Sequence, residues 1–240
     1  QNQLYKNHLE KAMSYTLSQK RPCLPNAAKT GCLYFSYEQP TLGANAFAIM
    51  ALSNIRKLPV ISNDTKESYL KEMVLLEEYL SLSFPNNSLI YTDKVDETSK
   101  RYEEGQVLMA WVRLYEATGD TKYLGKANIL MKGIITKMNE VNDYKLHHWL
   151  WLGLKDYYLV TEQNLSPEVL DYVIKSAEEL LNSQRQDQLD PNYGTFTDTD
   201  DLAATDSTDE GTHPRETSSL SVKIEGLGSL LYLLSRDTQA

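Results

Sequence analysis

The chain has 240 residues, with 24 Lys and Arg against 33 Asp and Glu, 41% hydrophobic residues and two cysteines. This composition excludes a disulfide-framework miniprotein, a collagen-like repeat and a wholly disordered chain, and predicts one sizeable core or at most two domains. The net charge of −9 argues against a nucleic-acid partner, and no apolar stretch approaches the roughly 20 residues that cross a bilayer, so we expect no membrane insertion.

Hydrophobic spacing near 3.6 residues predicts eight helices. They cover residues 2–20, 43–58, 65–83, 102–118, 121–139, 146–161, 167–184 and 217–236. Asp64 marks the start of the third helix, Gly119 and Asp120 separate the fourth from the fifth, and Ser166 with Pro167 begins the seventh as N-cap and first-turn proline. The chain is therefore predicted to be all-α, with short extended pieces in its loops.

The predicted helices alternate in character along the chain. Four of them are apolar on several faces, which indicates burial all round, whereas those between carry one apolar stripe among Lys and Glu. Short aromatic segments precede the four apolar helices, with starts separated by 58, 54 and 50 residues: Gly31–Tyr37, Leu89–Thr92, Asp143–Leu146 and Tyr193–Thr197. The repeat predicts four helical hairpins, with inner helices lining a concave face and outer helices covering them.

Three segments resemble known proteins. Arg101–Leu124 looks like an inner-to-outer hairpin of the α/α toroid, or six-hairpin glycosidase-like, superfamily, and His148–Leu154 and Ser218–Leu227 resemble its later inner helices. Members include N-acylglucosamine epimerases, glucuronyl epimerases and unsaturated glucuronyl hydrolases. The resemblance implies an α/α toroid that acts on sugars in a central cavity. A full ring has about six hairpins, so the chain is either a fragment, an open ring, or a partial ring completed by a partner chain.

Glu225 is the leading candidate for acid–base chemistry. It interrupts an otherwise apolar helix, and Ser218 and Ser221 share its face, so a small polar groove runs along that helix. A buried carboxylate is costly unless it is paired or faces a solvated cavity. Glu225 is therefore interpreted either as a catalytic acid or base, or as an ion-pair partner of Lys223 or Arg113.

Glycan chemistry commonly needs a second carboxylate. Glu103 and Glu104 begin the second inner helix, and we expect Glu104 to act with Glu225 and Tyr102 to be an auxiliary catalytic group. The structural alternative is that acids in a first turn only complement the helix dipole.

The third inner helix begins with two histidines and two tryptophans. Imidazole exchanges protons near neutral pH and tryptophan stacks on the apolar face of a sugar ring, so His148 is expected to be a further auxiliary catalytic group. The alternative is a set of core aromatics with a histidine at the helix end. The predicted substrate contacts are Tyr37, Gln106, Arg113, Trp149, Trp151 and Arg215.

The remaining features are less specific. Residues 185–216 form a long acidic loop, interpreted as a solvated lid, because its Asp198–Asp201 run lacks the Gly and closing Glu of a calcium loop. No Walker, Rossmann or zinc signature occurs, so no cofactor and no metal is expected. Cys23 and Cys32 are either a local disulfide, which would indicate a periplasmic or secreted protein, or two free thiols.

The sequence thus predicts a carbohydrate-active protein that binds a glycan on the concave face of an α/α toroid and acts as a glycoside hydrolase, lyase or epimerase. The alternative is a non-catalytic helical-repeat module that binds a glycan, a peptide or a partner protein. Paired carboxylates across an enclosed cavity favour the enzyme, and isolated acids on an open groove favour the module.

Overall fold

The computed structural model describes residues 2–22, 31–33, 40–91, 97–145, 147–184, 188–189 and 215–237. The chain divides into two compact units, residues 1–133 and 134–240, which are described separately. The described residues form eight α-helices, a two-stranded antiparallel sheet and one 3₁₀ turn. In chain order these are α1 (Asn2–Ser18), β1 (Lys20–Pro22), β2 (Gly31–Leu33), α2 (Leu42–Arg56), α3 (Asn63–Leu82), η1 (Pro85–Asn87), α4 (Glu97–Thr118), α5 (Thr121–Val141), α6 (His148–Thr161), α7 (Pro167–Asn182) and α8 (Arg215–Asp237).

The eight predicted helices are confirmed, and their ends lie within two residues of the predicted ends, except that α4 begins at Glu97. The N-cap of α3 is Ser62, whose hydroxyl accepts the Thr65 amide at 3.2 Å, so the prediction that Asp64 marks this start is corrected: Asp64 lies in the first turn, where its charge favours the helix dipole. Ser166 caps α7 as predicted.

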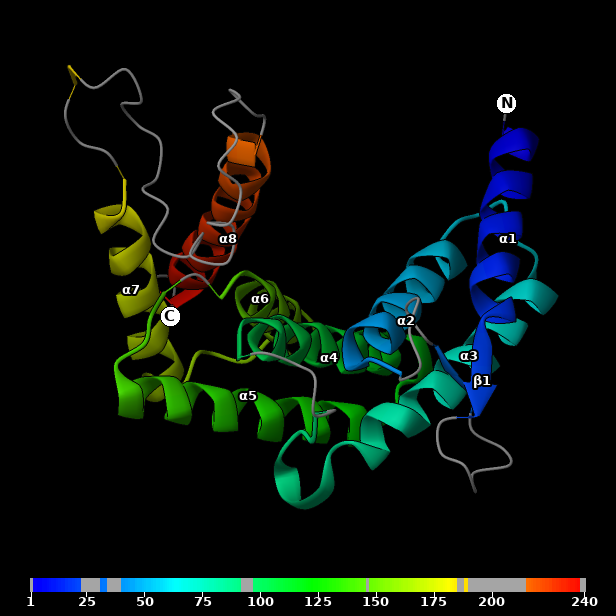
Figure 1. The fold of residues 1–240 in the computed structure, drawn as a ribbon, viewed down its shortest axis with the longest axis horizontal. Coiled ribbons are helices and arrows are strands. Elements are labelled where there is room, and N and C mark those ends of the chain that lie inside the picture. The colour runs from blue at the N-terminus through cyan, green and yellow to red at the C-terminus, as the bar shows by residue number, and fades with distance from the viewer. Residues whose placement is uncertain are drawn as a thin grey trace, which may run out of the picture. The chain divides into compact units, whose positions relative to one another are not determined.

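The first unit shows the predicted alternation of inner and outer helices. Helix α2 packs against both α3 and α4, and Figure 1 shows α2 beside these two helices. Helix α2 buries ten of its 15 residues, whereas α3 buries six of its 20. Because small and apolar residues cover several faces of α2, it fits between neighbours, while the single apolar stripe of α3 leaves its other faces to solvent.

The core of the first unit contains a buried carboxylate. Glu77 of α3 is 5% exposed, and its Oε1 accepts hydrogen bonds from Trp111 Nε1 at 3.2 Å and from Lys126 Nζ at 2.7 Å, together with one from Ser81. Trp111 is fully buried and meets Phe84 edge to face, with ring centroids 5.0 Å apart. The carboxylate is thus stabilised by three donors, which offsets the cost of its burial.

The short sheet leads the chain toward α2. Asn45 of α2 is fully buried, and its side chain accepts the Leu33 amide at 3.2 Å and donates to the Leu33 carbonyl at 3.3 Å. These two bonds fix β2 against α2. Cys32, in the same strand, is fully buried and disulfide-bonded, which decides between the two interpretations of the cysteines; Cys23, the other cysteine of the sequence, lies outside the described residues.

Reduction of the disulfide is expected to lower the free energy of unfolding by about 2–3 kcal/mol, because a cross-link that closes a loop of about ten residues removes chain entropy from the unfolded state. Urea unfolding with and without a phosphine reductant measures this difference. A Cys32→Ser variant should show the same loss and no further response to the reductant. Equal unfolding midpoints for the oxidised and reduced protein would contradict this prediction.

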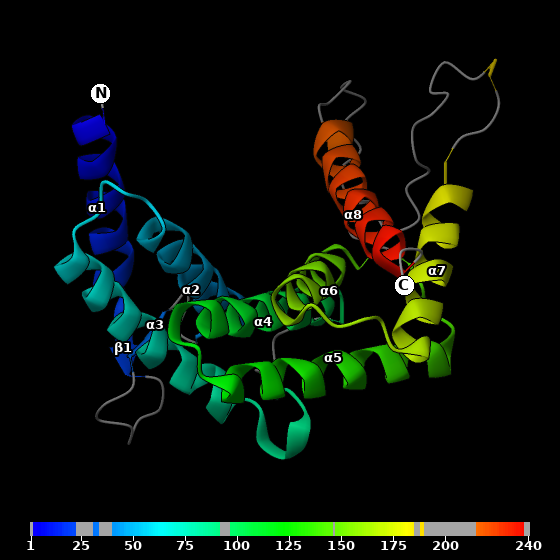
Figure 2. The same ribbon diagram turned by 180° about the vertical axis from the view of Figure 1, so that it is seen from behind.

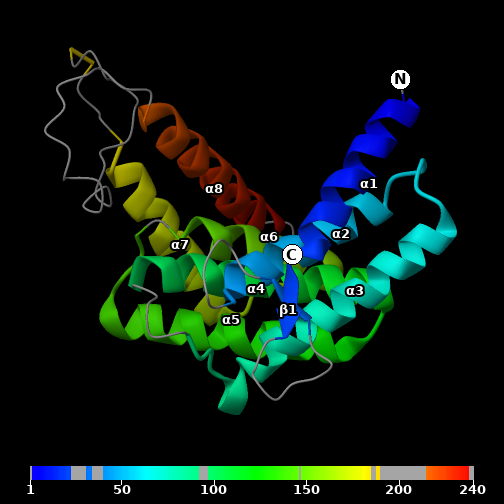
Figure 3. The ribbon, with the colours of Figure 1, turned by 45° about the vertical axis from the view of Figure 1, so that its right-hand side comes forward.

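The second unit repeats the arrangement. Helix α8 packs against α6 and α7, and α7 and α8 lie side by side in Figures 2 and 3. Helix α6 buries nine of its 14 residues, whereas α7 buries six of its 16. Near the end of α8, Arg236 Nη1 donates to the Tyr158 carbonyl of α6 at 2.7 Å. The inner helices α6 and α8 are therefore held together, which places the start of α6 against the middle of α8.

Candidate functional site

The start of α6 gathers the aromatic residues that the sequence analysis singled out. His147 occupies the N-cap position, and its carbonyl accepts the Trp151 amide at 3.0 Å in the first turn. His147 and His148 are both buried, at 4% and 3% exposure, whereas Trp149 is half-buried. Of the three side chains, Trp149 is the one with surface open to a ligand.

His148 and Glu225 form a hydrogen-bonded pair. His148 Nε2 lies 2.8 Å from Glu225 Oε2, and 77 residues of sequence separate the two. An ionised carboxylate only accepts hydrogen bonds, so the imidazole N–H donates. The side chain of His148 is 4% exposed, whereas that of Glu225 is 59% exposed. The sequence offers Lys223 or Arg113 as a charged partner of Glu225, and the structure places His148 on its carboxylate.

Trp149 completes this cluster. Its ring meets the His148 ring edge to face, with centroids 4.9 Å apart and planes inclined by 61°. Trp151, by contrast, is fully buried among the core residues of the second unit, so its ring has no face exposed to a ligand. The first turn of α6 therefore sends one tryptophan to the surface and the other inward, as expected for positions two apart on a helix.

The cluster of His148, Trp149 and Glu225 has the chemistry of an acid–base site. The exposed carboxylate can take or give a proton, and the buried imidazole fixes its orientation through Nε2. The partly exposed indole offers an apolar face beside it.

Helix α4 carries the predicted site residues of the first unit. Tyr102 is 39% exposed, Glu104 is half-buried and Gln106 is 7% exposed. The neighbouring Glu103 accepts the backbone N–H of Gly43, at the start of α2, at 3.2 Å. Burial raises the pKa of the Glu103 carboxyl, and the Gly43 hydrogen bond opposes this rise.

The sequence points to both Glu103 and Glu104 at the start of this helix, with the catalytic role predicted for Glu104. The spacing of Glu103 and Gln106 indicates that they lie together, because residues three apart share one face of a helix.

Arg113 lies further along α4, in an ion-pair network. Its Nη1 is 2.7 Å from Glu116 Oε2, and Lys57 Nζ is 3.1 Å from the same oxygen. Burial alone would raise the pKa of Glu116, but hydrogen bonds and charges from Arg113 and then Lys57 hold this pKa below its usual range. The guanidinium of Arg113 thus forms an ion pair with a carboxylate of its own helix.

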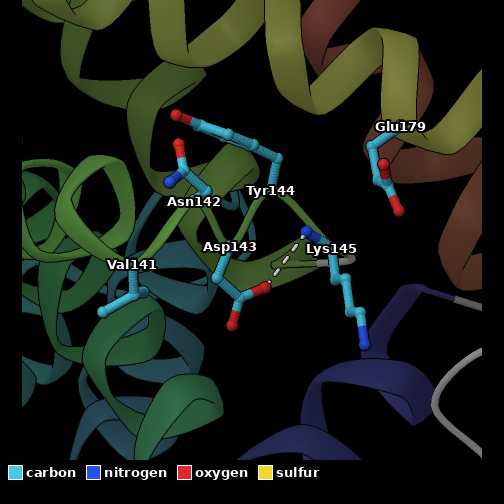
Figure 4. Close-up of a pocket in the computed structure, with 6 residues that line it drawn as sticks. All are labelled: Val141, Asn142, Asp143, Tyr144, Lys145 and Glu179. Carbon is cyan, nitrogen blue, oxygen red and sulfur yellow. Dashed lines mark hydrogen bonds between the residues drawn. The ribbon is translucent and has the colours of Figure 1, made fainter.

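A pocket of about 330 Å³ lies in the second unit, between the end of α5 and the last turns of α7. Figure 4 shows its lining residues: Val141, Asn142, Asp143, Tyr144, Lys145 and Glu179. The Tyr144 hydroxyl accepts a hydrogen bond from Lys175 Nζ at 3.3 Å, and Asp171 lies 2.8 Å from the same ammonium. The lining includes Asp143, Tyr144 and Lys145 of the third predicted aromatic segment but neither His148 nor Glu225.

Several predicted residues lie outside the described part of the chain. These are Tyr37 and the acidic loop up to residue 214, apart from residues 188 and 189; Arg215 begins α8, but its side chain is not among those described. Among the described residues, no group of three or more His, Cys, Asp or Glu side chains is placed to hold a metal ion. No helix in the described ranges is long and apolar enough to span a membrane.

The described residues form eight helices, and the more buried α2 and α6 are each followed by a more exposed helix, α3 and α7, which is an all-α fold of the α/α toroid class. A comparison with solved structures agrees. The chain is similar to the GH76 α-mannanase of Bacteroides thetaiotaomicron, an (α/α)6 toroid glycosidase, with a TM-score of 0.55 and 14% sequence identity. The similarity covers 96% of this chain and 62% of the mannanase, so the chain spans less than two thirds of that neighbour.

Comparisons of the sequence find no match. No protein-family model matches the chain, and no curated protein matches it either. The similarity to the mannanase at 14% identity concerns the fold.

Proposed function

We propose that the protein is carbohydrate-active, binding a glycan at the cluster of His148, Trp149 and Glu225 and changing it by acid–base chemistry. The observation that carries this proposal is the 2.8 Å hydrogen bond between a buried imidazole and an exposed carboxylate, with a partly exposed indole beside them. Glu225 exchanges the proton, His148 holds the carboxylate in position, and Trp149 stacks on a sugar ring.

The fold supports a sugar as the ligand, because the solved neighbour is an α-mannanase with the same class of fold. This support is by analogy, since one fold can carry many functions. The reaction is hydrolysis, elimination or epimerisation, all of which need a proton transfer of this kind. For Tyr102 and Glu104, which lie in the first unit, the auxiliary catalytic roles remain predictions from the sequence.

A periplasmic or secreted location is proposed as well. The disulfide of Cys32 supports it, because structural disulfides form and persist mainly in oxidising compartments.

One observation favours a second candidate, a non-catalytic glycan-binding module. The side chain of Glu225 is 59% exposed, as expected for a carboxylate on an open surface and not in a closed catalytic cavity. In that case the same cluster binds sugar without turnover.

A glycan screen separates these candidates. The wild-type protein is mixed with oligosaccharides of α-mannan, of uronic acids and of hexosamines, and both the thermal midpoint and the release of products are measured. The enzyme proposal predicts a raised midpoint with one class and new products from it. A raised midpoint without products favours the module, and no response to any class contradicts both candidates.

A further inference from the structure

A second polar cluster lies where α2 begins and α4 passes beside it, in the first unit. The two helices pack together, as Figure 1 shows, and the Gly43 amide in the first turn of α2 donates to Glu103 Oε1 of α4 at 3.2 Å. Thr41 already caps α2 by accepting the Ala44 amide at 3.1 Å. The contact with Glu103 therefore adds to a helix start that already has its cap.

Gly43 makes room for two side-chain oxygens. A Cβ at this position would lie 2.6 Å from Gln106 Oε1 and 3.4 Å from Glu103 Oε1. The first distance is well inside a normal contact, so any larger residue would displace the Gln106 amide. The absence of a side chain at Gly43 thus allows Glu103 and Gln106 to converge on the same point.

Gln106 is the observation that points to a ligand. Only 7% of the residue is exposed, and no hydrogen bond joins its amide to any residue that the structure describes. The amide atoms are not among the fully buried unpartnered atoms, so they still reach solvent. A bound molecule can therefore offer this amide a hydrogen-bond donor and an acceptor in place of water.

The cluster suits a neutral molecule. Burial is the main influence on the pKa of Glu103, which it raises, and among the described residues no Lys or Arg charge contributes to this shift. A carboxylate without a cationic neighbour repels an anionic ligand but accepts hydrogen bonds from uncharged hydroxyl groups. An acid beside an amide therefore matches the hydroxyl groups of an uncharged sugar.

We propose that Glu103 and Gln106, placed together by Gly43, form a sugar-binding site of the first unit that selects neutral glycans over uronic acids. The inference rests on the proposed function and adds the substrate class. Gln106 donates and accepts one hydrogen bond through its amide, and Glu103 bonds a second hydroxyl group of the same sugar.

The test uses the full chain and two probes of equal length, an α-mannan oligosaccharide and a uronic-acid oligosaccharide. Calorimetric titration compares the wild type with Gln106→Leu, Gly43→Ala and Glu103→Gln. Gln106→Leu and Gly43→Ala should weaken mannan binding at this first-unit site at least about tenfold, because each removes the amide from the site. Glu103→Gln should keep mannan binding within about threefold and strengthen uronate binding, because it removes the negative charge but keeps hydrogen-bonding groups.

Glu116→Gln is the matched control, since it changes a carboxylate of the same helix that lies in the network with Arg113 and Lys57. It should leave both affinities unchanged. If the wild type binds mannan and all three site variants bind it equally well, the inference is overturned while the proposed function stands. A wild type that prefers the uronate also overturns the inference alone. If the wild type binds neither probe and no glycan in the screen raises its thermal midpoint or yields products, both the inference and the proposed function are overturned.

The thermal midpoint of each variant separates lost folding from lost binding. If Gln106→Leu or Gly43→Ala proves unfolded, Glu103→Gln decides the question through the ratio of its two affinities, which a merely structural role would not change. An unchanged ratio in that variant rejects the site.

Discussion

Replacing Glu225 by Gln is expected to lower the turnover of the glycan substrate by about 100- to 10,000-fold, the usual contribution of one acid–base group. In the wild type, His148 Nε2 lies 2.8 Å from the Glu225 carboxylate. The amide of Gln keeps an oxygen that can accept this hydrogen bond, so the local geometry should persist. What the variant loses is the group that exchanges a proton. The turnover number and KM of wild type and variant, measured with the glycan that the screen identifies, give the result.

Stability provides the first control for this variant. The side chain of Glu225 is 59% exposed, so its replacement should change the free energy of unfolding by at most about 1 kcal/mol. Glu178→Gln provides the second control, since it changes an exposed carboxylate of α7 in the same unit and should leave turnover unchanged. If Glu225→Gln turns over substrate at the wild-type rate, Glu225 has no catalytic role.

The largest effect on stability is expected for Trp111→Ala, at about 3–5 kcal/mol. Trp111 is fully buried, meets Phe84 edge to face at 5.0 Å and donates its indole N–H to Glu77. Truncation leaves a cavity and removes one of the donors that stabilise the buried carboxylate. Most domains have a free energy of unfolding of only about 5–15 kcal/mol, so this loss is a large fraction of the total. Urea unfolding followed by circular dichroism measures it.

Two further variants separate packing from hydrogen bonding at this position. Trp111→Phe keeps much of the ring volume but loses the bond to Glu77, and should cost less than the alanine variant. Leu82→Ala removes a large side chain that is 55% exposed, and should change stability by no more than about 0.5 kcal/mol. A cost below about 1 kcal/mol for Trp111→Ala would contradict the described core.

The helices and their inner or outer character could be predicted because both depend on local sequence. The apolar and small residues of α2 indicate burial on several faces wherever the helix lies, and the Ser166–Pro167 pair begins a helix by itself. The N-cap of α3 was placed wrongly because Ser62 and Asp64 are both capping residues, and the backbone decides between them.

The candidate site could be predicted only in part. Glu225 and His148 were each singled out, because a charge within an apolar helix and a histidine at a helix start are local signals. Their pairing across 77 residues depends on how α6 packs against α8, which no local pattern specifies. Likewise, the direction of each side chain distinguishes Glu103 from Glu104, and this direction depends on the approach of Gly43.

The most direct test of the central claim is a crystal structure of the Glu225→Gln variant with the glycan that the screen identifies, α-mannan oligosaccharide being the first choice. We predict a sugar ring stacked on Trp149, with an oxygen atom about 2.6–3.2 Å from the side chain of residue 225. A structure with well-ordered oligosaccharide, none of which touches Trp149 or residue 225, would contradict the account.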